Sequence, residues 1–214
     1  MSARTEPGIA VLVSGGGRSL ENLAGVIERG ELPGRIALVL SNTPKAFALE
    51  RASRLGIPSV VIDPERKLSP EEFSRDAFAA IESFGCEIAV MAGFLRLLRI
   101  PERWIGRVLN IHPALLPAFG GKGFYGNRVH QAVLASGVKE TGCTVHYVDN
   151  EYDHGPVLLQ RRIEVRAGDT VETLAARVFE EEKLALPEAL RRHLSAERGP
   201  SGRGAPGSAS SRAS

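Results

Sequence analysis

The feature that most constrains the fold of this chain is the alternation of short aliphatic runs with amphipathic segments. Each aliphatic run has the length of a buried strand, and the segments between them have the pattern of surface helices. Such alternation predicts βαβ units, and therefore one α/β domain with a doubly wound, mainly parallel sheet and helices on both faces. The expected strands are 9–13, 36–40, 59–62, 88–92 and 108–111, and the expected helices are 19–29, 45–54, 70–84 and 101–105.

The pattern changes after residue 111. Residues 127–135 are predicted to be helical, 141–148 and 157–165 to be two longer strands, and a last helix to run from Asp169 to about His193. Asp169 and Glu172 have the spacing of a capping box at the start of that helix. We expect one domain over residues 1–194, with halves at about 8–100 and 101–194. Residues 195–214 are rich in Gly, Ser, Pro and Arg and are expected to be a disordered tail.

Composition and charge argue against several classes of protein. The chain has 214 residues, 43% hydrophobic and 24% charged, which suits a globular domain with a sizeable core. No apolar run approaches the ~20 residues of a membrane span, and the first residues lack the apolar core of a signal peptide. The net charge of +2 is matched by the last 20 residues alone, which hold three arginines and one glutamate. The rest of the chain is nearly neutral, so its charge does not indicate a nucleic-acid-binding surface.

Two cysteines, Cys86 and Cys143, are too few for a disulfide framework. This usage suits the reducing cytoplasm. Neither cysteine has C-x-x-C spacing, so we expect no zinc site and no other metal.

The segment NIHPALLP at residues 110–117 is the strongest candidate for chemistry. The alternation of a strand puts Asn110 and His112 on one face and turns Ile111 into the core. Pro113 and Pro117 end the strand, so both polar side chains lie at its carboxyl end, where open α/β sheets bind ligands. An amide can donate to an oxyanion and an imidazole can move a proton. Without further signals, two satisfied polar residues at a strand end would be the better interpretation.

A glycine-rich loop, SGGGRSL at residues 14–20, joins the first expected strand to the first expected helix. Glycines let backbone N–H groups approach an anion, and a helix N-terminus favours negative charge. Leu20 stands where a dinucleotide fingerprint has its third glycine, which argues against a dinucleotide. The loop also lacks the lysine of a nucleotide-hydrolysing phosphate loop. It therefore predicts an anion site that suits neither a dinucleotide nor the hydrolysis of a nucleoside triphosphate.

A second segment, DNEYDHGP at residues 149–156, supports a catalytic interpretation of the segment at residues 110–117. Together they resemble the formyltransferase family that uses 10-formyltetrahydrofolate, whose pattern is N-x-H-P-x-L-L-P followed some forty residues later by an Asp in a D-x-G-P loop. Asn110, His112 and Asp153 match that pattern. The resemblance includes SGGG at 14–17, AGFLRLL at 92–98 and TVH at 144–146, and it covers about residues 8–194. It implies the Rossmann-like fold of that family.

The resemblance also implies a role for each matched residue. Asn110, His112 and Asp153 are expected to be catalytic, and His146 is expected to support them from behind, with His130 a weaker candidate. The ribotide phosphate falls to the first half of the domain and the folate to the second. The expected ribotide contacts are Gly15, Gly16, Gly17, Arg18, Ser19 and Glu182, and the expected folate contacts are Leu95, Arg96, Leu97, Leu98 and Asn110.

The chain departs from the family pattern at three places. Arg18-Ser19 replaces the usual Ser-Asn of the glycine loop, and Lys183 stands where the family often has a histidine. Pro70 replaces an arginine that some members use at the folate tail, which leaves Lys67 as a possible substitute.

The function implied is formyl transfer from 10-formyltetrahydrofolate to 5-phosphoribosylglycinamide in purine biosynthesis, with Asp153 raising the pKa of His112. The partners expected are these small molecules, with no metal, nucleic acid or membrane, in a monomer or homodimer. Three alternatives remain open. A formyltetrahydrofolate hydrolase typically has an extra N-terminal domain, and the first strand starts by Ile9. A methionyl-tRNA formyltransferase usually has a C-terminal domain, and only a short tail follows His193. The third alternative is a non-enzymatic phosphate-binding module.

Overall fold

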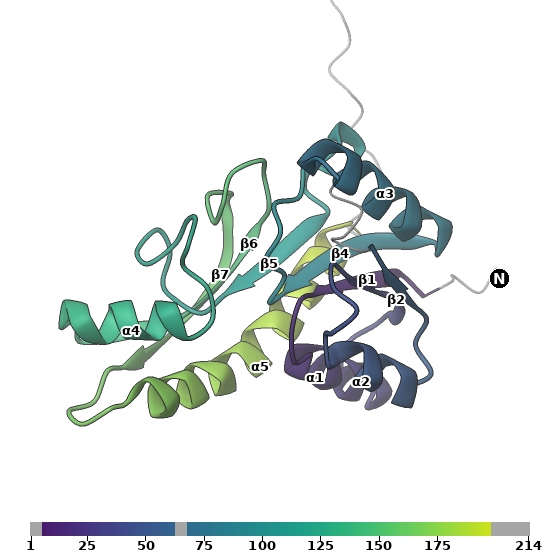
Figure 1. Cartoon of the computed structure of the whole chain (residues 1–214). Helices are drawn as coiled ribbons and strands as arrows, with labels where there is room; N and C mark the ends of the chain where they lie inside the picture. Colours follow the sequence, from purple (N-terminus) through teal and green to yellow (C-terminus); the bar gives the residue numbers. More distant parts are fainter. Residues whose placement is uncertain (1–5, 63–67, 198–214) are drawn as a thin grey trace, which may run out of the picture.

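The computed structural model describes residues 6–62 and 68–197 of the chain. Within them one seven-stranded sheet has the strand order β3-β2-β1-β4-β5-β6-β7 (Figure 1). Neighbouring strands from β3 to β5 are parallel, and β6 and β7 are antiparallel to their neighbours. The predicted fold class is therefore confirmed. The strands are β1 (Gly8–Val13), β2 (Arg35–Ser41), β3 (Ser59–Val61), β4 (Cys86–Ala92), β5 (Val108–His112), β6 (Glu140–Tyr147) and β7 (Val157–Glu164).

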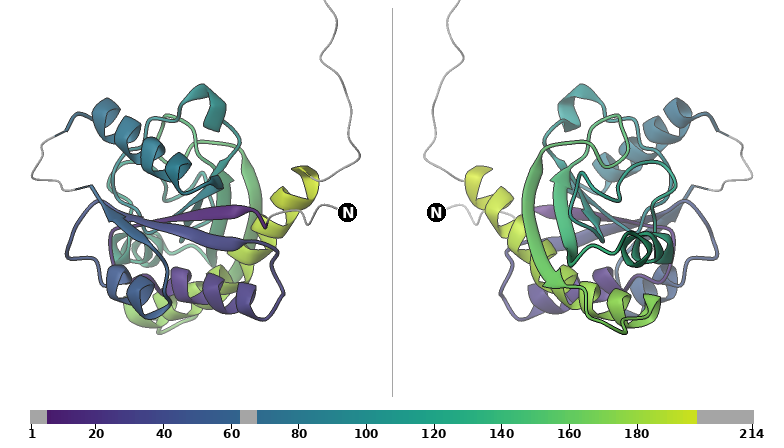
Figure 2. Two further views of the ribbon diagram at one scale, coloured as in Figure 1. Left: turned by 90° about the vertical axis from the view of Figure 1, so that its right-hand side faces the viewer. Right: turned by 90° about the vertical axis from the view of Figure 1, so that its left-hand side faces the viewer.

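Helices cover both faces of the sheet, as the two side views in Figure 2 show. One apolar core lies between the sheet and α1, α2 and α5, and a second lies between the opposite face and α3 with the 3₁₀ turn η2. Alternate residues of the central strands supply the two cores, as expected for buried parallel strands. The helices are α1 (Arg18–Glu28), α2 (Ala48–Arg54), α3 (Pro70–Ser83), η2 (Glu102–Trp104), α4 (Asn127–Ser136) and α5 (Val171–Glu197).

The strand order reverses between β1 and β4, which is the place where open α/β sheets form a ligand crevice. The glycine loop follows β1, and residues 93–98 follow β4. Ser14 joins these two segments. Its backbone N–H donates to the Gly93 carbonyl (3.1 Å), and its Oγ accepts from the Leu95 N–H (2.9 Å). The same Oγ donates to Asn42 Oδ1 (2.6 Å), so β1, β2 and β4 are tied together at one edge.

The start of α5 differs from the prediction. Thr170 and Thr173 bond reciprocally there: the Thr173 N–H donates to Thr170 Oγ1 (3.3 Å), and the Thr170 N–H donates to Thr173 Oγ1 (2.8 Å). Asp169 accepts hydrogen bonds from the Thr173 hydroxyl and from Arg177 instead of forming the predicted capping box with Glu172. The Thr173 hydroxyl, three residues after Thr170, can both donate and accept a hydrogen bond. The capping-box rule, which looks for Glu at that spacing, did not predict this pair.

The end of α5 also differs from the prediction. The helix continues to Glu197, so the predicted tail is helical over its first three residues. Leu194 is buried against the core and stabilises this last turn. Residues 198–214, the rest of the predicted tail, lie outside the described residues.

Two further properties concern only residues 6–62 and 68–197. None of their helices is long and apolar enough to cross a membrane, and they contain no group of three His, Cys, Asp or Glu side chains suited to a metal ion. Cys86 and Cys143 are free and buried. Burial raises the pKa of Cys86 to about 11 and that of Cys143 to about 12, so both thiols stay protonated at neutral pH.

A capping box closes the start of α3. Ser69 Oγ accepts from the Glu72 N–H (3.2 Å), and Glu72 Oε2 accepts from the Ser69 N–H (2.9 Å). We expect Ser69→Ala to lower the free energy of unfolding by about 1 kcal/mol and Ser69→Gly by only a few tenths. Urea unfolding of the two variants measures this difference. An undiminished stability of Ser69→Ala would show that the hydroxyl does not stabilise the helix.

Candidate active site

Two polar side chains project from the carboxyl end of β5. Asn110 and His112 share one face of the strand, and Ile111 packs into the core on the other face, as the strand alternation predicted. The antiparallel partner β6 places His146 opposite Asn110. Because β5 is flanked by β4 and β6, its end is held rigidly on both sides.

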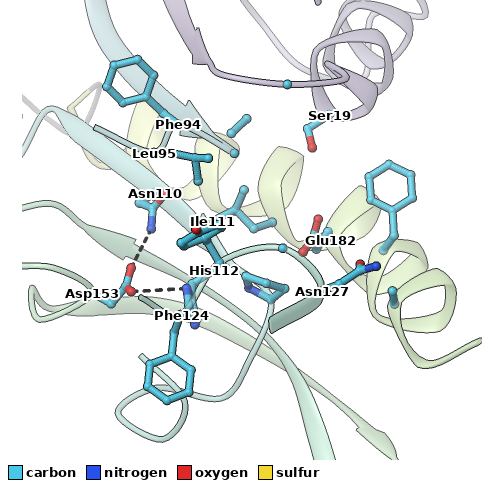
Figure 3. Close-up of a pocket in the computed structure, with 18 of the residues that line it drawn as sticks. Ser19, Phe94, Leu95, Asn110, Ile111, His112, Phe124, Asn127, Asp153 and Glu182 are labelled. Carbon is cyan, nitrogen blue, oxygen red and sulfur yellow. Dashed lines mark hydrogen bonds and ion pairs between the residues drawn. The ribbon is translucent and has the colours of Figure 1, made fainter. Parts of the chain in front are cut away.

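Asp153 completes this cluster from the loop between β6 and β7. Its Oδ1 accepts from Asn110 Nδ2 (3.2 Å), its Oδ2 accepts from the Gly121 N–H (2.9 Å), and Oδ2 lies 3.5 Å from His112 Nδ1 (Figure 3). Burial raises the pKa of this carboxyl, but its contacts with His146 and His112 and the Gly121 N–H outweigh burial. The pKa of Asp153 therefore lies below its usual value, and the side chain is ionised at neutral pH.

His112 is held from the other side of its ring. Its side chain is 4% exposed, and its Nε2 bonds the Phe119 carbonyl at 2.8 Å. Since a carbonyl only accepts, Nε2 carries the hydrogen, and in the neutral ring Nδ1 keeps its lone pair toward Asp153. Phe119 and Asp153 are the two non-glycine residues with positive φ in the described part of the chain, at 56° and 52°. Backbone strain is thus concentrated at the contacts of His112.

Asp153 raises the pKa of His112, as predicted, but burial of the ring acts against it. Burial lowers the pKa, and the nearby Asp153 carboxylate and Phe119 carbonyl raise it by less, so the net shift is downward from the usual 6.5. Burial destabilises the imidazolium more than the attraction of one carboxylate at 3.5 Å stabilises it. His112 is therefore neutral at pH 7 and can accept a proton on Nδ1.

His146 sets the direction of the Asn110 amide. Its Nδ1 bonds the Tyr147 carbonyl (2.9 Å), so in the neutral ring Nε2 is an acceptor. Asn110 Nδ2 lies 3.0 Å from that Nε2 and 3.2 Å from Asp153 Oδ1. Both acceptors require the NH₂ group to face them, so the structure places His146 directly behind Asn110, where the sequence predicted a supporting residue.

A cavity of about 630 Å³ joins this cluster to the glycine loop. It extends from residues 15–19 past the end of β5 to residues 92–95, with the loop after Gly121 and one side of α5 as further walls (Figure 3). Ten of the predicted site residues line it: Gly15, Gly16, Gly17, Arg18, Ser19, Leu95, Asn110, His112, Asp153 and Glu182.

Three of the predicted folate residues do not line this cavity. Leu98 is 1% exposed and belongs to the core beside α3. The Arg96 guanidinium stacks over the Phe73 ring at 4.3 Å and donates to the Leu68 carbonyl (2.5 Å). Leu97 is likewise outside the lining. Only Leu95 of the four presents its side chain to the cavity, because the chain turns away after β4.

Arg18 meets α5 across the cavity. Its guanidinium lies 3.6 Å from the centre of the Phe179 ring, a cation–π contact that fixes its direction. Glu182 follows Phe179 by one helical turn and also lines the cavity. Burial raises the pKa of Glu182 to about 7, although the positive charge of Arg18 opposes that shift. The sequence showed Arg18 as a departure from the family pattern but gave no sign of its aromatic partner.

The loop of residues 121–127 was not predicted to belong to the site. Lys122, Phe124, Tyr125 and Asn127 all line the cavity from it. The loop contains three glycines, which have positive φ, and two aromatic residues, which are exposed. This combination of glycine and aromatic residues was the signal in the sequence that could have identified the loop as part of the site.

Comparison with known proteins identifies the family. The sequence model of the family described as formyl transferase matches residues 8–190. The chain belongs to the formyl transferase family. It is 43% identical over 185 residues to the trifunctional purine biosynthetic protein adenosine-3 of Gallus gallus. The matched region covers 86% of this chain and 18% of that protein. The chain is 35% identical to the phosphoribosylglycinamide formyltransferase of Escherichia coli (strain K12), over 84% of this chain and 83% of that one.

The fold comparison agrees. The crystal structure of glycinamide ribonucleotide transformylase 1 from Symbiobacterium toebii matches with a TM-score of 0.83 and 38% identity, covering 92% of this chain and 90% of that one. Several curated relatives are longer. The chain spans 56% and 61% of two chloroplastic relatives and less than a fifth of the trifunctional ones.

The glycine loop offers a test of anion binding. A side chain at Gly16 meets no atom within 4 Å, whereas a Cβ at Gly17, where φ is +75°, would lie 2.6 Å from Ala48 Cβ. We expect Gly16→Val to weaken binding of ribose 5-phosphate about tenfold or more, the worth of one or two backbone hydrogen bonds, with unchanged stability. Gly17→Val should instead lower the midpoint of thermal unfolding. Calorimetry and thermal unfolding separate the two outcomes, and undiminished binding in Gly16→Val would remove the loop from the site.

Proposed function

We propose that this chain transfers the formyl group of 10-formyltetrahydrofolate to the amine of 5-phosphoribosylglycinamide, a step of purine biosynthesis. One observation carries the proposal. A single cavity contains an anion-binding loop, the Asn110–His112–Asp153 cluster and a wall after β4 that can hold a heterocycle. A phosphorylated acceptor and a formyl donor can therefore meet at the cluster.

The ribotide is proposed to bind between the glycine loop and α5. Backbone N–H groups at the start of α1 suit its phosphate, and the fixed guanidinium of Arg18 supplies a cation beside them. Glu182 faces the same space and suits the ribose hydroxyls. This arrangement lets the amine at the far end of the ribotide extend toward His112.

The folate is proposed to bind along residues 92–95. Leu95 is 51% exposed and lines the cavity, where a flat ring would cover it. The backbone after β4 offers polar groups to the pterin edge. Pro70, which replaces the family's arginine at the folate tail, is the first residue of α3, and Lys67, the substitute considered, lies outside the described residues.

The reaction uses His112 as a proton carrier. The ribotide amine attacks the formyl carbon, and Nδ1 of neutral His112 accepts the proton that the nitrogen loses. The resulting imidazolium lies between the Phe119 carbonyl and the Asp153 carboxylate, both of which stabilise its charge. As the bond from carbon to the folate nitrogen breaks, His112 returns the same proton to that nitrogen. No net proton, metal ion or covalent enzyme intermediate is needed.

Asn110 is proposed to stabilise the oxyanion of the tetrahedral intermediate. In the free site one of its N–H groups is 3.2 Å from Asp153 Oδ1, a weak contact. When His112 becomes positive, the Asp153 carboxylate is drawn toward the ring, and that N–H is released to the developing oxyanion. Proton uptake and oxyanion stabilisation are thereby coupled through Asp153.

A cytoplasmic location is proposed on the two free, buried cysteines. A monomer or homodimer remains the prediction for the assembly.

Removal of the proton carrier should act on the chemical step. We expect His112→Ala and Asp153→Asn each to lower kcat by about 10²- to 10⁴-fold, with much smaller effects on ribotide binding. His154→Ala is the matched control, because His154 is exposed in the same loop and bonds only Asp149. Steady-state kinetics at pH 7 measures the effect. An unchanged kcat in a folded His112 variant contradicts the mechanism.

The hydrolase alternative shares these catalytic residues, so the acceptor must distinguish the two reactions. We expect deformylation of 10-formyltetrahydrofolate to be slow alone and to rise by orders of magnitude, roughly 10³-fold, when 5-phosphoribosylglycinamide is added, because the bound amine is a positioned nucleophile. Spectroscopic detection of tetrahydrofolate formation checks this. Fast deformylation that is indifferent to the ribotide would favour the hydrolase, and no deformylation with either would favour a binding module.

A further inference from the structure

A second imidazole lines the cavity beside the catalytic one. His130 lies one turn after Asn127 on α4, and both residues belong to the cavity lining. Residues at i and i+3 share a helix face, so α4 presents one polar face, Asn127 with His130, to the bound molecules. The mechanism above does not use either side chain.

His130 is buried without a hydrogen-bond partner. His130 is 5% exposed, and its Nδ1 has no hydrogen-bond partner among the described residues. A buried polar atom left unsatisfied is costly to a fold and calls for an explanation. Burial, together with the nearby His112, lowers the pKa of His130, so its ring is neutral and offers one N–H donor and one acceptor.

The position of this face points to the ribotide. In Figure 3, Asn127 lies on the side of Glu182 and Ser19, away from Phe94 and Leu95. His130 and His112 both line this cavity. A molecule that runs from the glycine loop to His112 therefore passes this face of α4.

We propose that His130 positions the acceptor by hydrogen bonding the secondary amide that joins glycine to ribose in 5-phosphoribosylglycinamide. This assignment rests on the proposed function. The amide lies between the phosphate and the reactive amine, and it has the donor and acceptor that complement a neutral imidazole. The ring, which makes no hydrogen bond through Nδ1 in the free protein, then gains one from the ligand, and the amine is directed at the formyl carbon.

The test compares His130→Leu, His130→Gln and Gln131→Leu in the full chain. Gln131 is the exposed neighbour on α4 and does not line the cavity, so its variant is the matched control. Affinity for 5-phosphoribosylglycinamide and for ribose 5-phosphate, which lacks the amide, is measured by calorimetry. KM is measured for both substrates.

We expect His130→Leu to weaken ribotide binding about tenfold, the worth of a hydrogen bond in a buried site, and to leave ribose 5-phosphate affinity and the folate KM within about twofold. His130→Gln should recover part of the loss, because an amide also donates and accepts. The leucine variant should unfold at the same or a higher temperature, since it removes an unsatisfied buried atom.

Two results would overturn the assignment. Equal weakening for the ribotide and for ribose 5-phosphate would show that His130 only shapes the fold, and unchanged ribotide affinity would show that it makes no contact. Absence of formyl transfer in the unaltered chain would overturn the proposed function and this assignment together. Transfer in the unaltered chain with either of the first two results would overturn the assignment alone.

Discussion

The buried carboxylate of Asp153 is the interaction on which the site depends. It accepts hydrogen bonds from the Asn110 amide and from the Gly121 N–H, and it lies beside the His112 ring. One side chain therefore joins the end of β5, the loop before α4 and the loop between β6 and β7. Its charge favours the protonated form of His112, which the proposed proton transfer requires for a short time. Loss of this carboxylate would affect the geometry and the chemistry together.

In the proposed function, the topology of the sheet brings the two substrates together. The reversal of strand order between β1 and β4 opens the crevice, and Ser14 bonds the segments that follow these strands. The glycine loop and the segment after β4 are thus fixed relative to each other by a few short hydrogen bonds. Such a rigid arrangement suits a reaction in which alignment of an amine with a formyl carbon lowers the barrier.

Much of this architecture could be predicted from the sequence because it follows from local patterns. The aliphatic runs predicted every strand within a few residues, and strand alternation placed Asn110 and His112 on one face. The remainder depends on contacts between distant residues. The net lowering of the His112 pKa was not predicted, because the extent of burial is a property of the packed fold. The stacking of Arg18 on Phe179 and the turn that takes Leu98 into the core have no local signature either.

The central claim is that His112 is neutral at pH 7, with its hydrogen on Nε2 and a free lone pair on Nδ1. Nitrogen NMR of the uniformly ¹⁵N-labelled protein tests it most directly, with the His112 signals assigned from a His112→Gln variant. The account predicts a pKa below the usual ~6.5 and a neutral form protonated on Nε2. A pKa above 7, or a neutral form protonated on Nδ1, would contradict it, because Nδ1 could not then accept the proton of the attacking amine.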